Sequence, residues 1–204
     1  MEIWLKWAIE IQSLAQAGLA YTDNVYDKER YERLREIAAE IIAKKADLTL
    51  EKVEDLFCNE NGYQTPKIDT RAAIFEDDKI LLVHENNGTW ALPGGWCDVL
   101  ESAKSNTEKE VREEAGLNVK AIKIIAIQDR NKHNKPIYAY GVWKVFVLCE
   151  VIDGEFKKNI ETTETKYFSI QNLPPNLAEE KTTKEQIEMC FKAYQNKEWQ
   201  TQFD

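Results

Sequence analysis

The hydrophobic pattern of the chain changes at Pro66, and this change constrains the fold more than any other feature. Before Pro66, apolar residues recur every three or four positions, which is typical of amphipathic helices. After Pro66, short runs rich in β-branched and aromatic residues favour strands. We therefore predict an α+β protein, with a small all-helical domain over residues 1–62 followed by a mixed sheet flanked by helices over residues 66–204.

The N-terminal domain is expected to contain two long amphipathic helices and a short one. They cover residues 1–20, 27–45 and 48–60, and Thr49 is a suitable cap for the third. The apolar stripe of the first consists of Trp4, Ala8, Ile11, Ala15 and Leu19, and that of the second of Tyr31, Leu34, Ile37, Ala38 and Ile41. Helices with spare apolar surface often pair, so we expect a homodimer.

Aromatic residues of these helices leave an alternative open. They are Trp4, Trp7, Tyr21, Tyr26 and Tyr31. Instead of packing within a dimer module, any of them could stack on a nucleobase bound by the neighbouring subunit, and the domain would then act as a substrate lid.

The larger domain is expected to begin with a hairpin around Asp77-Asp78. Further strands are expected within residues 119–131, 138–152 and 165–170, with a turn at Asp153-Gly154, and an amphipathic helix within residues 182–199. Tyr138, Tyr140 and Trp143 alternate on the second of these strands, where core packing explains them better than base stacking.

A helix is also predicted between Ser102 and Ala115, because this segment lacks proline and glycine and Gly116 provides a C-terminal stop. Three glutamates on it are spaced i, i+3 and i+4, which puts their carboxylates on one face. They are Glu110, Glu113 and Glu114.

Crowded carboxylates have two explanations. A hard divalent cation such as Mg²⁺ or Mn²⁺ takes oxygen ligands and would relieve their repulsion. Alternatively, the face is simply solvated, with Lys109 and Arg112 neutralising their neighbours. The spacing alone favours the solvated face, but Gly94-Gly95 upstream allows a tight backbone close to a ligand, which favours a metal and phosphate site.

The spacing of these residues resembles the Nudix box. Gly95 is followed after five residues by Glu101 and, after seven more, by the segment Lys109–Leu117, which reads KEVREEAGL. Each defined position of the box matches except Lys109, which stands where the family has arginine. Lysine keeps the charge but loses the forked geometry, so we expect activity that survives at a reduced level.

The resemblance implies an α/β/α sandwich that hydrolyses a nucleoside diphosphate linked to another group. Gly95, Glu110, Glu113 and Glu114 would bind the divalent cation, which would be Mg²⁺ or, in its place, Mn²⁺, and the three glutamates would be catalytic. Glu101 and Lys109 would support the site, and Gly94 and Gly95 would lie against the substrate. The cation would neutralise the diphosphate and polarise a phosphorus for attack by water.

Two residues outside the box are further candidates. Glu161, preferred over Glu164, lies in a loop before a strand and would serve as an extra ligand or general base. Arg71 begins the apolar run before the hairpin and would bind a phosphate through two hydrogen bonds, or else pair with a surface acid.

Residues 12–43 resemble the helical N-terminal domain of a bacterial Nudix subgroup whose members act on CDP-choline or ADP-ribose. On this resemblance we expect CDP-choline to be split into CMP and phosphocholine, with ADP-ribose hydrolysis as the alternative. A third hypothesis is a non-catalytic nucleotide sensor.

The net charge of -9 argues against general nucleic-acid binding, because such proteins are usually basic. The four cysteines form no CxxC pair, and no apolar run is long enough to span a bilayer. We therefore expect a cytoplasmic enzyme with a small-molecule substrate and no membrane partner.

Overall fold

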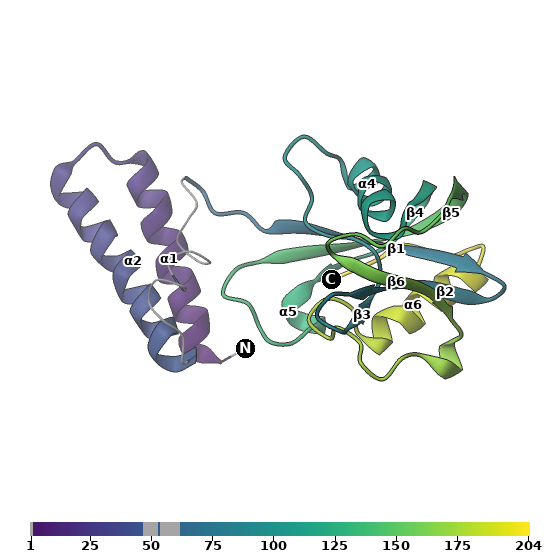
Figure 1. Ribbon diagram of the computed structural model, residues 1–204. Coiled ribbons are helices and arrows are strands. Elements are labelled where there is room, and N and C mark those ends of the chain that lie inside the picture. The colour runs from purple at the N-terminus through teal and green to yellow at the C-terminus, as the bar shows by residue number, and fades with distance from the viewer. Residues whose placement is uncertain (1, 47–52, 54–61) are drawn as a thin grey trace. The chain divides into compact units, whose positions relative to one another are not determined.

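The computed structural model describes residues 2–46, 53 and 62–204, which divide into two compact units (Figure 1). The first unit consists of Met1–Pro66 and Ile137–Gly141, and the second of Lys67–Pro136 and Val142–Asp204. The short helix expected over residues 48–60 lies outside the described residues, apart from Val53.

Two helices, α1 (Ile3–Tyr21) and α2 (Val25–Ala46), form the first unit as expected. Asn24 starts α2 by accepting hydrogen bonds from the backbone N–H groups of Tyr26 and Asp27. The core of the unit consists of Leu5, Ala8, Ala38, Ala39, Ile42 and Val53, with Ile137 and Ala139 packed against it. Leu34, expected on the apolar face of α2, is 39% exposed, because that face is centred on the alanines.

The second unit is built on a mixed sheet. Its strands are β1 (Lys67–Glu76), β2 (Lys79–Glu85), β3 (Trp90–Ala91), β4 (Leu117–Asp129), β5 (Val142–Gly154), β6 (Thr162–Phe168) and β7 (Gln202–Phe203). The order is β3-β2-β1-β5-β4-β7, and β6 pairs with the other side of β2. The β1–β5 and β4–β7 pairs are parallel, and the rest are antiparallel.

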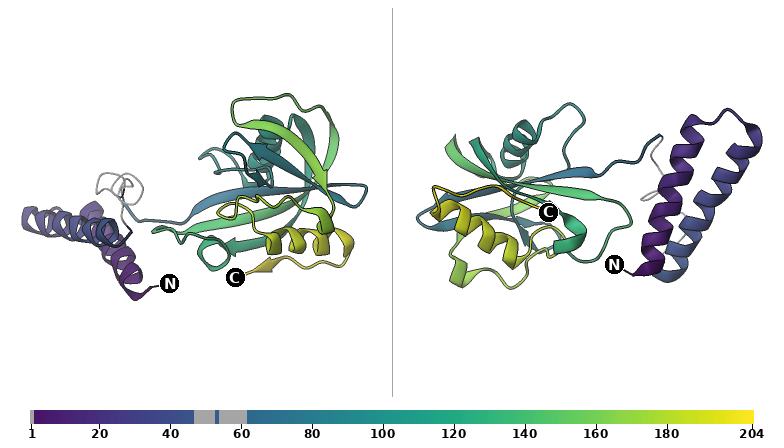
Figure 2. Two further views of the ribbon diagram at one scale, coloured as in Figure 1. Left: turned by 60° about the horizontal axis from the view of Figure 1, so that its bottom comes forward. Right: turned by 180° about the vertical axis from the view of Figure 1, so that it is seen from behind.

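Helices cover both faces of the sheet (Figures 1 and 2). On one face, α4 (Ala103–Ala115) packs over Ala72 and Ile74 of β1. On the other, α6 (Lys184–Gln195) packs over Ala73 of β1. The side chains of β1 thus alternate between two cores, which makes the expected α/β/α sandwich. Two further short helices in the described part of this unit are α5 (Arg130–His133) and η1 (Ile170–Asn172).

The hairpin of β1 and β2 is confirmed. Asp77 and Asp78 both have positive φ, 47° and 55°, and Glu76 pairs with Lys79. Two adjacent residues of positive φ are typical of a type I′ turn, whose twist suits a two-residue hairpin.

Two details of the predicted strands are wrong. Tyr138 and Tyr140 precede β5, since their segment belongs to the helical unit, and Trp143 is 52% exposed rather than in the core. Asp153 and Gly154 are not a turn, because β5 continues through them and pairs with the residues that follow α4.

No α-helix within the described ranges combines the length and apolar character that crossing a bilayer requires.

Candidate active site

The glutamate helix α4 begins and ends as its sequence predicts. The Ser102 hydroxyl accepts a hydrogen bond from the Ser105 N–H at 3.1 Å, and Ser105 bonds back to the Ser102 backbone, which forms a capping box. Gly116 ends the helix in the left-handed conformation, with φ of 69°. Val111 and Ala115 are fully buried, so the helix is anchored by one face while its glutamates lie elsewhere on its surface.

The segment after β3 runs beside the first half of β1, which β2 leaves unpaired. The Ala72 N–H donates to Pro93 O at 2.8 Å, the Thr70 N–H to Gly95 O at 2.9 Å, and the Cys97 N–H to Ile68 O at 2.8 Å. The sheet therefore fixes the backbone around Gly94 and Gly95.

Close approaches occur at both glycines of this segment, to the backbone of β1 at Gly94 and to the flexible end of a side chain at Gly95. Gly94 has φ of 141°, and a Cβ there would overlap the carbonyl oxygen of Thr70. A Cβ at Gly95 would lie 2.6 Å from Oε2 of Glu110. The Gly94 N–H donates to Oε2 of Glu114 at 2.8 Å, so the glycine loop and the glutamate helix are in direct contact.

Two of the glutamates are held in an environment that disfavours their charge. Burial raises the pKa of Glu114 to about 7, against the opposing effects of Arg71 and the Gly94 N–H, while the carboxylates of Glu110 and Glu85 raise it further. Burial also raises the pKa of Glu110, against the effect of Lys109. Such a negative, partly buried pair is stabilised by a cation.

Lys109 lies among the carboxylates. Its Nζ is 2.9 Å from Oδ2 of Asp98, 3.4 Å from Oε1 of Glu110 and 3.5 Å from Oε2 of Glu113, and these contacts raise its pKa. The side chain of Glu113 is 54% exposed. The residue that departs from the Nudix box thus partly neutralises two of the predicted metal ligands.

Within the described part of the chain, no three acidic, histidine or cysteine side chains are already gathered into a metal-binding group. The donors nevertheless suit a hard divalent cation, since Glu110 and Glu114 offer carboxylate oxygens under mutual repulsion. The carbonyl oxygen of Gly95 accepts one hydrogen bond and retains a second lone pair.

Glu101 lies in the loop directly before the cap of α4, where its backbone N–H donates to Asp98 O at 2.9 Å. Cys97, in the same loop, has a pKa raised by burial and by neighbouring carboxylates, so it is not an activated thiol.

Glu161 is exposed and lies on a loop that is tied to α4. The Asn159 side-chain amide donates to Glu113 O at 2.8 Å, and its oxygen accepts from the Glu161 N–H at 2.9 Å. Glu164, in contrast, belongs to β6 and pairs with His84 of β2. The loop position therefore remains compatible with the predicted role of Glu161.

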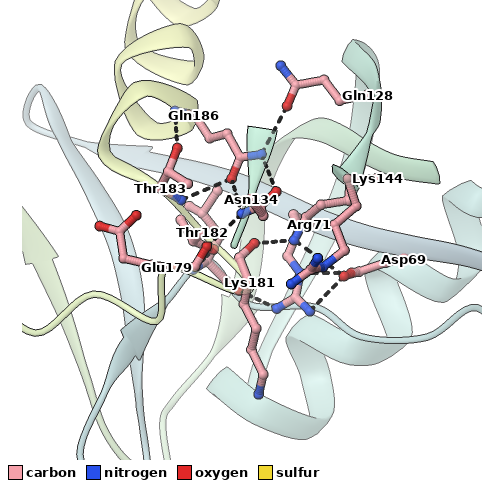
Figure 3. Close-up of polar contacts among 12 residues, drawn as sticks. Asp69, Arg71, Gln128, Asn134, Lys144, Glu179, Lys181, Thr182, Thr183 and Gln186 are labelled. Carbon is pink, nitrogen blue, oxygen red and sulfur yellow. Dashed lines mark hydrogen bonds and ion pairs between the residues drawn. The ribbon is translucent and has the colours of Figure 1, made fainter. Parts of the chain in front are cut away.

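Arg71 is only 4% exposed, and its guanidinium binds protein groups (Figure 3). Nε and Nη2 donate to the Asp69 carboxylate at 2.8 and 3.1 Å, and Nη1 donates to Leu92 O at 3.2 Å. The alternative of a surface acid as its partner is wrong, since Asp69 is 7% exposed.

Charged residues near the site that the sequence alone did not single out include Asp69, Glu85, Lys144 and Lys181. Glu85, at the end of β2, is 9% exposed, and both its oxygens lie 2.7 Å from Nζ of Lys181. Lys144 is fully buried on β5. The signal for Lys144 was a lysine within the otherwise apolar run VWKVFVLC, since a buried lysine requires partners.

A mixed sheet between two helices, with a glycine loop hydrogen-bonded to an acidic helix, forms a site that can hold a divalent cation next to a phosphate. Residues 66–189 match the family model described as "NUDIX domain", and residues 2–57 match "UDP-X-like, N-terminal oligomerisation domain". The chain belongs to the Nudix family and is a Nudix pyrophosphohydrolase.

Relatives cover nearly the whole chain. A Bacillus subtilis (strain 168) protein named "Putative ADP-ribose pyrophosphatase YjhB" is 39% identical over 98% of this chain and 97% of its own length. A solved ADP-ribose pyrophosphatase from Streptococcus suis 89-1591 is 53% identical over 69% of this chain and 100% of its own, with a TM-score of 0.64. A solved UDP-X diphosphatase is 35% identical over 98% and 97%, also with a TM-score of 0.64.

The position of Lys109 permits a direct test of the departure from the box. We expect Lys109→Arg to raise kcat up to about fivefold, because a guanidinium can bind two carboxylates in a fixed fork. Lys109→Met should lower kcat about tenfold, because it removes the positive charge between the glutamates. Steady-state kinetics of the three proteins at saturating metal would measure this, and equal rates for the lysine and methionine forms would contradict it.

Proposed function

We propose that the protein hydrolyses the diphosphate of ADP-ribose to AMP and ribose 5-phosphate, with Mg²⁺ as its cofactor and Mn²⁺ as a substitute. The observation that carries the metal-dependent hydrolysis in this proposal is the hydrogen bond from the Gly94 N–H to Glu114, in a partly buried site that disfavours the carboxylate charge. A cation bound there would find preoriented oxygen ligands next to a loop that can approach a phosphate.

The bound cation would neutralise the diphosphate and make a phosphorus more electrophilic. Glu110, Glu113 and Glu114, with the carbonyl of Gly95, are the proposed ligands. Gly94 orients Glu114, Lys109 limits the repulsion between Glu110 and Glu113, and Glu101 supports the loop before α4. This division of roles gives the chain the positioning and charge stabilisation that phosphoryl transfer requires.

Glu161 is the proposed general base or further ligand, because its loop is tied by Asn159 to the end of α4. Arg71 contributes positive charge near Glu114. To bind a phosphate, its guanidinium would first have to release a group that it already contacts, such as the Asp69 carboxylate.

The choice of substrate rests on the relatives. Two of the three reported above carry ADP-ribose in their names, and the third is named for UDP-X. None of these three names supports the CDP-choline specificity expected from the sequence. A UDP-linked compound is therefore the second candidate, favoured by the N-terminal family model and by the relative that covers 98% of the chain.

We further propose that residues 1–62 and 66–204 are the two domains and that the helical domain pairs in a homodimer. The family model that matches this region is described as an oligomerisation domain. Trp7, Leu14 and Tyr21 of α1 are more than half exposed in the single chain, which provides apolar surface for such pairing.

Product analysis of the purified protein tests the substrate. ADP-ribose, a UDP-sugar and CDP-choline would be incubated separately with Mg²⁺, and kcat/KM would be obtained for each. We expect ADP-ribose to be favoured by at least about tenfold, since a base-reading site rejects unmatched hydrogen-bonding groups. Faster release of UMP or of CMP would overturn the substrate and leave the chemistry intact.

A further inference from the structure

A cluster of three charged side chains lies buried on the sheet face that α6 covers (Figure 3). One of its members, Arg71, is close enough to Glu114 to lower the pKa of that carboxyl. Asp69 of β1 is directly opposite Lys144 of β5 in the parallel pair, and Arg71 is the next residue of β1 on the same face. Nζ of Lys144 is 3.4 Å from Oδ2 of Asp69. The two oxygens of the same carboxylate accept hydrogen bonds from Nε and Nη2 of Arg71.

This cluster and the segment it anchors hold the chain just before the glycine loop. Lys144 donates to the carbonyl oxygen of Lys181, and the adjacent Thr182 hydroxyl accepts a hydrogen bond from the Leu92 N–H at 3.2 Å. Arg71 donates to Leu92 O at 3.2 Å. Both backbone polar groups of Leu92, two residues before Gly94, are therefore fixed by the cluster or by the segment that Lys144 anchors.

Burying this cluster is costly. Lys144 has no exposed surface, and burial lowers its pKa to about 7, with the charges of Arg71 and Arg130 acting in the same direction and Asp69 opposing them. Buried ion pairs are often no more stabilising than apolar residues of similar volume. A contribution to stability is therefore a poor explanation for Lys144 and Arg71, whereas a geometric role fits their contacts.

We propose that Asp69, Arg71 and Lys144 are positioning residues, which fix Leu92 and thereby hold the Gly94 N–H at the place where it binds Glu114. Only the expected effect on kcat rests on the proposed function, whereas the positioning of the loop does not. Lys144 is fully buried and cannot touch a substrate, so its substitution separates positioning from binding.

A neighbouring part of the same core provides a control. Phe191 of α6 is 5% exposed, and its ring packs edge-to-face on Phe75 of β1 with the ring centroids 5.1 Å apart. This side chain has no group that can hydrogen-bond to Leu92 or to the segment around Thr182. Phe191→Leu should therefore lower stability without a selective effect on the glycine loop.

The test is amide hydrogen exchange of the full-length ¹⁵N-labelled protein, read by NMR. In Lys144→Met, the exchange rate of the Gly94 amide should rise about tenfold more than that of the Ile74 amide in the core of β1. In Phe191→Leu, the two amides should change together. With ADP-ribose as substrate, Lys144→Met should lower kcat about tenfold while KM stays within about threefold.

Arg71→Lys is a second variant in case Lys144→Met fails to fold. It keeps the charge and loses the fork to Asp69, and it should give the same selective loss of protection at Gly94. Equal changes at Gly94 and Ile74 in both variants, or a selective effect in Phe191→Leu, would overturn the proposal. Because exchange needs no substrate, it decides the positioning role even if ADP-ribose is not hydrolysed.

Discussion

Replacing Glu114 by glutamine should lower kcat about 10³-fold, equivalent to about 4 kcal/mol of transition-state stabilisation. The amide keeps the shape of the side chain and still accepts the hydrogen bond from the Gly94 N–H, but it no longer supplies a charged metal ligand. The non-catalytic sensor hypothesis predicts instead that function is nearly unchanged. Rates of Glu114→Gln and wild type at saturating Mg²⁺ and ADP-ribose measure the difference.

The same Glu114→Gln substitution should stabilise the folded protein above neutral pH, although it lowers kcat. The folded-state pKa of Glu114 is raised to about 7, so the folded protein retains a proton that the unfolded chain releases above its ordinary pKa of 4.5. Wild-type stability therefore falls as pH rises from 4.5 towards 7. The glutamine variant lacks this loss and should be more stable at pH near 8 by up to about 3 kcal/mol.

Denaturant unfolding of both proteins in metal-free buffer, repeated at several pH values, provides the check. Glu164→Gln is the control, since Glu164 is an exposed residue of β6. It should leave both kcat and stability unchanged. A Glu114→Gln protein that is less stable than wild type at pH near 8 would contradict the environment described for this carboxylate.

The second large effect is expected for Gly94→Ala. The added methyl group would overlap the carbonyl oxygen of Thr70, and the residue has φ of 141°. Backbone atoms of β1 cannot yield without breaking the hydrogen bonds of the loop to Thr70 and Ala72. We expect a loss of at least about 3 kcal/mol in unfolding free energy, together with loss of turnover.

Gly88→Ala is the matched control for this substitution. Gly88 also has positive φ, 88°, but nothing lies within 4 Å of an added Cβ. It should cost about 1 kcal/mol through backbone strain alone and leave kcat unchanged. Similar thermal and denaturant unfolding for the two alanine variants would show that the contact with Thr70 is unimportant.

The parts of the site that are local in sequence could be predicted from it. The glutamate spacing, the Ser102 cap and the Gly116 stop all act within one helix, whose other face carries the buried residues Val111 and Ala115. The hairpin at Asp77-Asp78 is local in the same sense.

The parts that depend on pairing of distant segments could not be predicted. Lys144 meets Asp69 only through the parallel register of β1 and β5, which no local pattern specifies. Glu85 finds Lys181 almost a hundred residues later, through the loop before α6. The fork between Arg71 and Asp69 spans only two residues, but the sequence does not show that both side chains are buried on one face of β1.

The most direct test of the central claim is the dependence of ADP-ribose hydrolysis on a divalent cation, followed by ³¹P NMR. The account predicts that the purified protein forms AMP and ribose 5-phosphate with Mg²⁺, that a chelator stops the reaction and that added Mg²⁺ restores it. Hydrolysis that continues unchanged in the chelator, or that proceeds equally well in Glu114→Gln, would contradict a metal held by the glutamate helix.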